Sequence, residues 1–238
     1  MTKTLLPFID DEDLTNEVRK VLDVAQIAVS AAENKIFSNI IDPFSAVFDS
    51  QRQGIAPSEW LQQEKARQIQ KTLQNAVGNF HQSILGHVDG WTNLAVGQVV
   101  DLRSDDNKVL AEIKNKYNTT KGNHKKTIYD DLLSLINHED FHDYKGYYVE
   151  IIPKSKNPYN KPFTPSDNET GIRRPENQNI RVIDGRSFYE LVTGHSNALD
   201  MLYEVLPRAI AVITGNNDSK ITVDPLYREL YKKAYPYS

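Results

Sequence analysis

Two acidic residues and a lysine lie close together in the segment VVDLRSDDNKVLAEIKNKYNTTKGNHKK, residues 99–126. Asp101 ends one short apolar stretch, and Glu112 and Lys114 belong to a second one, VLAEIK at 109–114. Because side chains alternate between the two faces of a strand, Glu112 and Lys114 share one face and the apolar residues between them point into a core. Two carboxylates and an amine on one face of a sheet are the layout of a metal-dependent phosphodiesterase.

The relative position of the two acids depends on the turn between the strands. The polar run from Ser104 to Asn107 predicts a tight turn. If this turn centres on residues 105 and 106, Asp101 lies opposite Leu110 and diagonal to Glu112. Diagonal neighbours in a sheet are about 7–8 Å apart, a gap that one divalent cation can bridge with two carboxylates.

The acid-any-lysine pattern is weak by itself, because the chain contains four further copies. These are Glu33-Asn34-Lys35, Asp106-Asn107-Lys108, Asp143-Tyr144-Lys145 and Asp218-Ser219-Lys220. Only the copy at 112–114 lies inside an apolar strand with an acid on the preceding strand. A plain surface hairpin remains the alternative interpretation.

Composition narrows the class of protein. The chain has 238 residues, of which 39% are hydrophobic and 25% charged, enough to bury the core of one α/β domain. It has no cysteine, which excludes disulfides and thiolate metal sites. The N-terminus MTKTLLPFIDDEDL lacks the apolar run of a signal peptide, and no stretch approaches the roughly 20 apolar residues of a membrane span. We therefore expect a cytoplasmic protein.

Charge is distributed unevenly along the chain. The net charge is −4, yet residues 114–186 contain 13 of the 28 basic residues and only 10 of the 32 acidic ones. A basic central segment in an acidic chain fits a local phosphate-contacting surface, although ordinary charge scatter explains the same count.

Two polar segments are candidates for DNA contact. Residues 115–126 lead directly from the acidic strand into a helix predicted over Thr127–Asn137, and a helix start preceded by lysines suits phosphate. The alternative is an exposed loop with an asparagine cap. The candidates are Lys116, Asn118, Thr119, Lys121, Asn123, His124 and Lys125. The second segment is a proline-rich loop over residues 153–178, whose Asn, Lys and Arg side chains are suited to reading base edges.

Histidines are weaker candidates for a functional site. His81 and Gln82 lie on a helix predicted over Pro57–Gly86, just before the strand with Asp101, and either is a possible auxiliary to the metal site or a structural residue. His138-Glu139-Asp140-Phe141-His142 matches the H-E-x-x-H zinc motif. This match lies at the end of a helix among further acids, without a third ligand, so we interpret it as a solvated connector.

Periodicity predicts the elements that position these residues. We expect helices at about 14–32, 57–86, 127–137, 187–192, 197–214 and 224–235, strands at 109–114, 147–152 and 179–183, an apolar connector at 36–54, and a turn at Asp184-Gly185. The predicted fold class is α/β, a central mixed sheet flanked by helices. We expect a single domain over 1–238, with a helical N-terminal part (1–55), a central core (56–207) and a helical C-terminal part (208–238).

The pattern of Asp101 followed by Glu112-Ile113-Lys114 resembles the PD-(D/E)xK nuclease signature, with Val100 in place of the usual proline. Four blocks are more specific: AEIKNKYNTTKGNHKKTIYDDL, GYYVEIIPK, YNKPFTPSDN and RRPENQNIRVIDGRSFYELVTG. They resemble the Type II restriction endonucleases that cut GGNCC, over about residues 78–207. The resemblance implies a restriction-endonuclease-like fold. It also implies that the single domain over 1–238 is an endonuclease domain, with residues 56–207 as its catalytic and DNA-recognition core.

This resemblance also implies a magnesium-dependent homodimer that cuts a short palindrome, GGNCC or GGWCC, in both strands of DNA. Asp101 and Glu112 would bind Mg²⁺ with the Ile113 carbonyl, and Lys114 would act on the attacking water and the phosphate. Candidates for base readout are Asn160, Lys161, Arg173, Arg174 and Arg181. A partner methyltransferase would protect the same DNA site without having to bind this protein. The alternatives are a structure-specific or repair nuclease with the same core, and a non-catalytic DNA-binding module.

Overall fold

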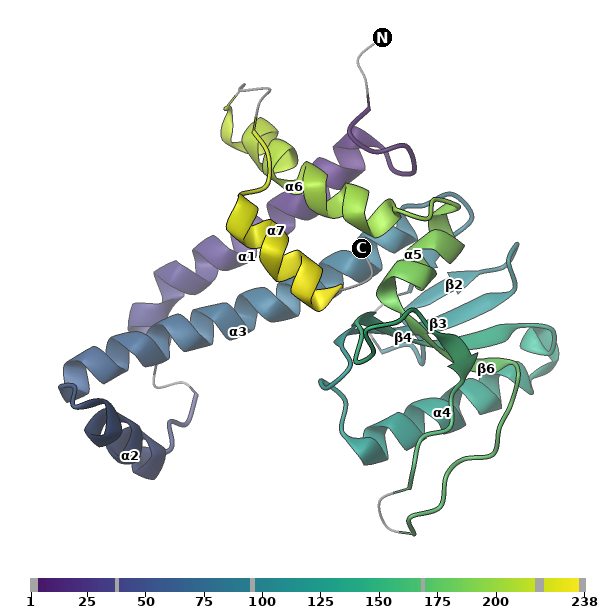
Figure 1. The fold of residues 1–238 in the computed structure, drawn as a ribbon, viewed down its shortest axis with the longest axis horizontal. Coiled ribbons are helices and arrows are strands. Elements are labelled where there is room, and N and C mark those ends of the chain that lie inside the picture. The colour runs from purple at the N-terminus through teal and green to yellow at the C-terminus, as the bar shows by residue number, and fades with distance from the viewer. Residues whose placement is uncertain (1–3, 37–38, 95–96, 168–169, 217–220, 236–238) are drawn as a thin grey trace. The chain divides into compact units, whose positions relative to one another are not determined.

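The computed structural model describes residues 4–36, 39–94, 97–167, 170–216 and 221–235. Its helices are α1 (Asp11–Lys35), α2 (Pro43–Gln53), α3 (Pro57–Gly86), α4 (Gly122–Ile136), α5 (Gly185–Thr193), α6 (Ala198–Thr214) and α7 (Pro225–Ala234), with a 3₁₀ turn at Glu139–Phe141. Its strands are β1 (Thr92–Asn93), β2 (Leu102–Ser104), β3 (Val109–Lys116), β4 (Lys145–Ile152), β5 (Asn160–Pro162) and β6 (Ile180–Asp184) (Figure 1).

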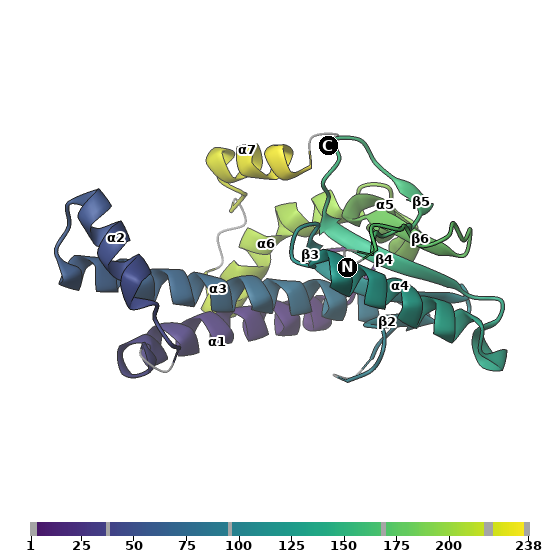
Figure 2. The same cartoon turned by 90° about the horizontal axis from the view of Figure 1, so that it is seen from below.

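The chain divides into two compact units, one formed by Met1–Val18 with Phe80–Ser238 and the other by Arg19–Asn79. The second unit is helical. Its helix α2 starts with Pro43 after the capping side chain of Asp42, and the Trp60 indole donates to Asp49 at 3.1 Å (Figure 2). The apolar connector predicted over residues 36–54 therefore contains a helix, and Pro43 begins this helix instead of breaking the segment.

The first unit contains one six-stranded mixed sheet in the order β1-β2-β3-β4-β6-β5. Strands β3, β4 and β6 are parallel, and the other pairings are antiparallel. The α/β class and the mixed sheet flanked by helices are thus confirmed, and the fold is consistent with the restriction-endonuclease-like architecture.

No helix within the described residues is both long and apolar enough to cross a bilayer. That the whole chain works as one endonuclease domain stays a prediction.

Helices cover both faces of the sheet (Figures 1 and 2). On one face, Leu132 of α4 packs with Leu110, Tyr148 and other buried residues into an apolar cluster. On the opposite face, the Tyr147 ring lies 6.1 Å from that of Phe188 on α5. Each fully buried apolar side chain contributes about 1.5–3 kcal/mol, so these two layers fix the orientation of the parallel strands.

The register between β2 and β3 differs from the predicted one. Leu102 pairs with Ala111 and Arg103 with Leu110, so Asp101 does not lie opposite Leu110. Instead it precedes β2, and its N–H donates to the Ala111 carbonyl at 2.9 Å. The cause is a longer turn over residues 105–108, in which Lys108 adopts a positive φ of 53°.

Two other predicted boundaries are wrong. Helix α4 begins at Gly122, not at Thr127, because Lys125 in its first turn is held by the Tyr117 carbonyl and by Glu150. Asp184 and Gly185 do not form a separate turn. Asp184 ends β6, and its carboxylate caps α5 by accepting the Ser187 N–H at 3.1 Å.

We predict that Gly185→Ala lowers the thermal stability of the protein. A Cβ at position 185 would lie 2.3 Å from the Ile151 carbonyl oxygen, a backbone atom of β4 that cannot move aside. Overpacking of this kind costs about 1–3 kcal/mol. Gly146→Ala is the control and should lower the stability less, since the nearest atoms to its Cβ would belong to the Leu132 side chain, at 3.1 Å. A melting temperature for Gly185→Ala equal to that of the wild type would contradict this packing.

Candidate active site

The three residues singled out by the sequence gather at one position of the sheet, where β2 separates from β3. The Oδ2 atom of Asp101 accepts the Ile113 N–H at 2.7 Å, which ties the Asp101 carboxylate to β3. Lys114 Nζ lies 2.6 Å from Glu112 Oε1. The Asp101, Glu112 and Lys114 side chains therefore form one connected group, which we call the acid–lysine cluster.

Limited solvent access changes the acidity of both carboxyls. The Glu112 side chain is only 14% exposed, and burial, followed by repulsion from Asp101, raises the pKa of Glu112 to about 7 even though Lys114 opposes the shift. Burial also raises the pKa of Asp101, against the lowering effects of the Ile113 N–H and Lys114. Two neighbouring acids whose charged forms are both disfavoured make a site that favours a cation.

Donor chemistry around the cluster suits a hard cation. In a strand, the N–H and C=O of one residue point to the same side, so the Ile113 carbonyl faces the side on which its N–H meets Asp101. Asp101, Glu112 and this carbonyl offer only oxygen atoms, the ligands that Mg²⁺ prefers. Among the described residues, no group of three His, Cys, Asp or Glu side chains is placed to bind a metal.

The polar segment after β3 divides between a loop and the first turn of α4. Asn118 and Thr119 are exposed, and the Thr119 hydroxyl donates to the Lys116 carbonyl at 2.8 Å. Lys121, Asn123 and His124 are also exposed at the start of α4. Lys125 differs from them, because it forms an ion pair with Glu150 at 2.7 Å.

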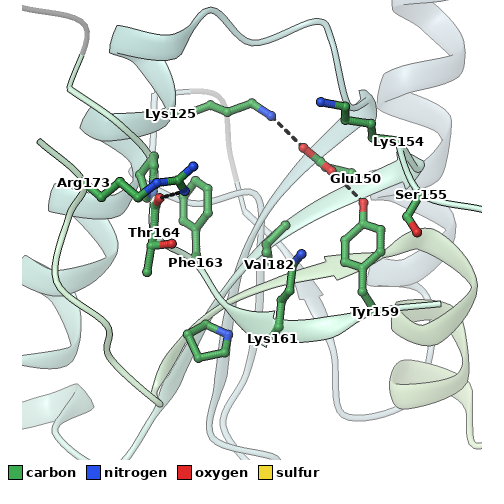
Figure 3. A pocket seen from close by; sticks show the side chains of 12 residues that line it. Lys125, Glu150, Lys154, Ser155, Tyr159, Lys161, Phe163, Thr164, Arg173 and Val182 are labelled. Carbon is green, nitrogen blue, oxygen red and sulfur yellow. Dashed lines mark hydrogen bonds and ion pairs between the residues drawn. The ribbon is translucent and has the colours of Figure 1, made fainter. Parts of the chain in front are cut away.

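The predicted base-reading residues fall into two groups. Arg174 forms an ion pair with Asp130 of α4 at 2.7 Å, and Arg181 donates to both the side chain and the carbonyl of Asn160. The guanidinium groups of both arginines are thus bound by other parts of the protein. In contrast, Lys161 and Arg173 line a pocket together with Lys125 (Figure 3).

The histidines considered as an auxiliary residue or as zinc ligands make hydrogen bonds within the protein. The Nδ1 atom of His81 is 2.7 Å from the Tyr189 hydroxyl, and burial lowers the pKa of His81 to about 4, so its ring is neutral at pH 7. An auxiliary role for Gln82 stays a prediction. His138 and His142 flank an exposed 3₁₀ turn, and each bonds within this turn.

Glu150 is the residue that the sequence reasoning missed. It is buried on β4, and the register places it directly beside Lys114 of β3. Its carboxylate binds Lys125 and accepts the Tyr159 hydroxyl at 2.6 Å. The available signal was a single carboxylate inside the otherwise apolar stretch Tyr147–Ile152.

Comparison with known proteins assigns the chain to a family. The sequence model of the Eco47II restriction endonuclease family matches residues 6–214. The chain belongs to the Eco47II restriction endonuclease family. It is 48% identical over 213 residues to the Type II restriction enzyme Eco47II of Escherichia coli, covering 88% of each chain. It is also 34% identical over 239 residues to the Type II restriction enzyme Sau96I of Staphylococcus aureus, covering 98% of this chain and 91% of that protein.

As a member of the Eco47II family, the chain is a Type II site-specific deoxyribonuclease. This result decides among the alternatives that the sequence left open, a repair nuclease and a non-catalytic module. Restriction enzymes act on double-stranded DNA and generally use a divalent metal ion. Within this Eco47II family member, the oxygen donors of the acid–lysine cluster fit such an ion.

We predict that Glu112→Gln is more stable than the wild type at pH 8 in EDTA. The folded protein holds the Glu112 proton more tightly than the unfolded chain does, so the wild type loses stability as the pH rises from about 4.5 to about 7. Glutamine does not titrate and avoids this loss. The stability difference between the two proteins should therefore shrink as the pH falls towards 4.5.

Thermal unfolding across this pH range measures the effect. Glu150→Gln is the matched control, a buried acid on the neighbouring strand whose charge is compensated by Lys125. Loss of this pair should destabilise the protein at pH 8 by about 1.5–3 kcal/mol. A wild type as stable as Glu112→Gln at pH 8 would show that burial beside Asp101 does not penalise the Glu112 carboxylate.

Proposed function

We propose that the acid–lysine cluster is the cleavage centre of this restriction endonuclease, and that Mg²⁺ is its metal ion. The observation that carries the proposal is the proximity of Asp101 and Glu112, two acids of limited exposure whose pKa values are both raised, with Lys114 bound to one of them. The proposed reaction is hydrolysis of one phosphodiester bond in each strand of a short palindrome, GGNCC or GGWCC.

Each side chain has a separate role in the proposal. Asp101 and Glu112 hold the ion with the Ile113 carbonyl, and Asp101 is oriented by the Ile113 N–H. When bound, Mg²⁺ supplies Lewis-acid polarisation of the phosphate and a lower pKa of the attacking water. The Lys114 ammonium, 25% exposed at the edge of the cluster, holds the attacking water and stabilises negative charge on the phosphate oxygens.

A palindromic target requires two equivalent centres, one for each strand. We therefore propose that the whole chain acts as one endonuclease domain within a homodimer. Sedimentation would then give a mass near twice the 27.1 kDa of one chain. A methyltransferase that modifies the same DNA sequence is the proposed functional partner, without a direct contact, and the cytoplasm is the proposed location.

Digestion of a sequenced plasmid tests the activity. With Mg²⁺, the fragment ends should all map to one palindromic sequence, and EDTA should abolish the cleavage. Fragment ends scattered along the plasmid would contradict cleavage at a GGNCC or GGWCC site.

We predict that Lys114→Ala lowers the cleavage rate by about 10²–10³-fold, because charge that develops on the phosphate loses the lysine cation. Binding of the cognate duplex in calcium should change little, since Asp101 and Glu112 remain. Lys145→Ala is the matched control, an exposed lysine at the start of β4 that belongs to another acid-any-lysine triplet. Equal cleavage rates for Lys114→Ala and Lys145→Ala would refute the role of Lys114.

A further inference from the structure

A pocket of about 540 Å³ lies against the end of β4, between β5 and the first turn of α4 (Figure 3). Its charged and hydroxyl-bearing walls include Lys125, Glu150, Lys154, Tyr159, Lys161 and Arg173. These side chains come from three parts of the chain that are far apart in sequence. Four cations therefore surround one hollow that contains a single carboxylate.

That carboxylate, Glu150, is fully engaged by the protein. Its Oε1 atom binds Lys125 Nζ at 2.7 Å, and its Oε2 atom accepts the Tyr159 hydroxyl at 2.6 Å. Only 8% of the side chain is exposed. Glu150 thus fixes the two walls of the pocket to each other, and its charge is balanced by Lys125.

The other three cations have no acidic partner within the described ranges. Arg173 donates one N–H to the Thr164 carbonyl at 3.1 Å, and Lys161 lies over the Tyr159 ring at 5.6 Å. Lys154 projects from the loop after β4 towards the same hollow (Figure 3). The neighbouring Arg174 shows the contrast, since it is paired with Asp130. The pocket therefore carries three positive charges that no acid of the described residues balances.

The pocket adjoins the proposed cleavage centre. Glu150 is the direct partner of Lys114 in the parallel pairing of β3 and β4. Neighbouring strands are about 4.8 Å apart, so the floor of the pocket begins one strand away from the acid–lysine cluster. The pocket is therefore about one strand spacing from the position at which the proposed function places the scissile phosphate.

We propose that this hollow, which we call the phosphate pocket, binds a phosphodiester group next to the one that is cleaved, through Lys154, Lys161 and Arg173. The inference rests on the proposed function, because the ligand is the same DNA. Arg and Lys also bind guanine edges, but here the cations line one hollow whose single carboxylate is already engaged, an arrangement that suits the localised charge of a phosphate. In this proposal Lys161 and Arg173 position the duplex and do not select its sequence.

Salt dependence of DNA binding tests this assignment. Lys154→Ala, Lys161→Ala and the double variant are titrated with a cognate and a non-cognate duplex in calcium, between 50 and 200 mM salt (about the range over which neutralised phosphates dominate the salt response). For each phosphate that the variant no longer neutralises, the slope of log K against log salt should become shallower by about 0.9. The cognate and non-cognate affinities should weaken by the same factor.

Lys156→Ala is the matched control, because Lys156 is an exposed lysine of the same loop that does not line the pocket. Its slope should equal that of the wild type. A slope unchanged in the double variant would overturn the phosphate pocket. Weakened binding of the cognate duplex alone would also overturn it, since this would assign the lysines to base edges.

Plasmid digestion by the wild type in Mg²⁺ is run in parallel, so that two failures can be told apart. If the wild type cuts at one palindrome and the double variant keeps the wild-type slope, only the phosphate pocket is wrong. If the wild type does not cut, the proposed function itself fails.

Discussion

Burial of the Asp101 and Glu112 carboxyls beside each other is the constraint on which the proposed site depends. Burial raises the pKa of both groups, and the charge of Asp101 raises that of Glu112 further, so the folded chain holds an arrangement that is unfavourable without a cation. Two local interactions partly offset this cost, the Ile113 N–H on Asp101 and the Lys114 ammonium on Glu112. A divalent ion would offset the remaining repulsion, and restriction enzymes generally use such an ion.

The sheet explains why these groups stay together. The longer turn at residues 105–108 sets the register of β2, so that Asp101 lies just before the first pair of β2 with β3. Parallel pairing of β3 with β4 then places Glu150 beside Lys114, and Glu150 ties α4 to the loop after β4 through Lys125 and Tyr159. The proposed cleavage centre and the pocket next to it are thus parts of one hydrogen-bonded framework.

Local patterns in the sequence predicted the α/β fold, helix α3 with its end at Gly86, and the strand that carries Glu112 and Lys114. They also predicted that Asp101 returns beside this strand. The register was wrong because a shift by two residues keeps the alternation of faces, so hydrophobic pattern alone does not fix it. Strand β5 was missed because three residues that include Pro162 carry too little pattern.

Glu150 could not be predicted because its importance comes from pairing across strands. Residues 114 and 150 are neighbours only through the parallel sheet, and the sequence does not show which strands pair. Likewise, the partners of Arg174 and Arg181, Asp130 and Asn160, become visible only in the fold. Base reading by these two arginines stays a prediction.

A crystal structure with a cognate duplex and calcium tests the central claim most directly, because calcium takes the same oxygen ligands as magnesium. The account predicts one cation bound by carboxylate oxygens of both Asp101 and Glu112, beside a DNA phosphate and within reach of Lys114. A cation held elsewhere in the protein, or an Asp101 carboxylate turned away from it, would contradict the account.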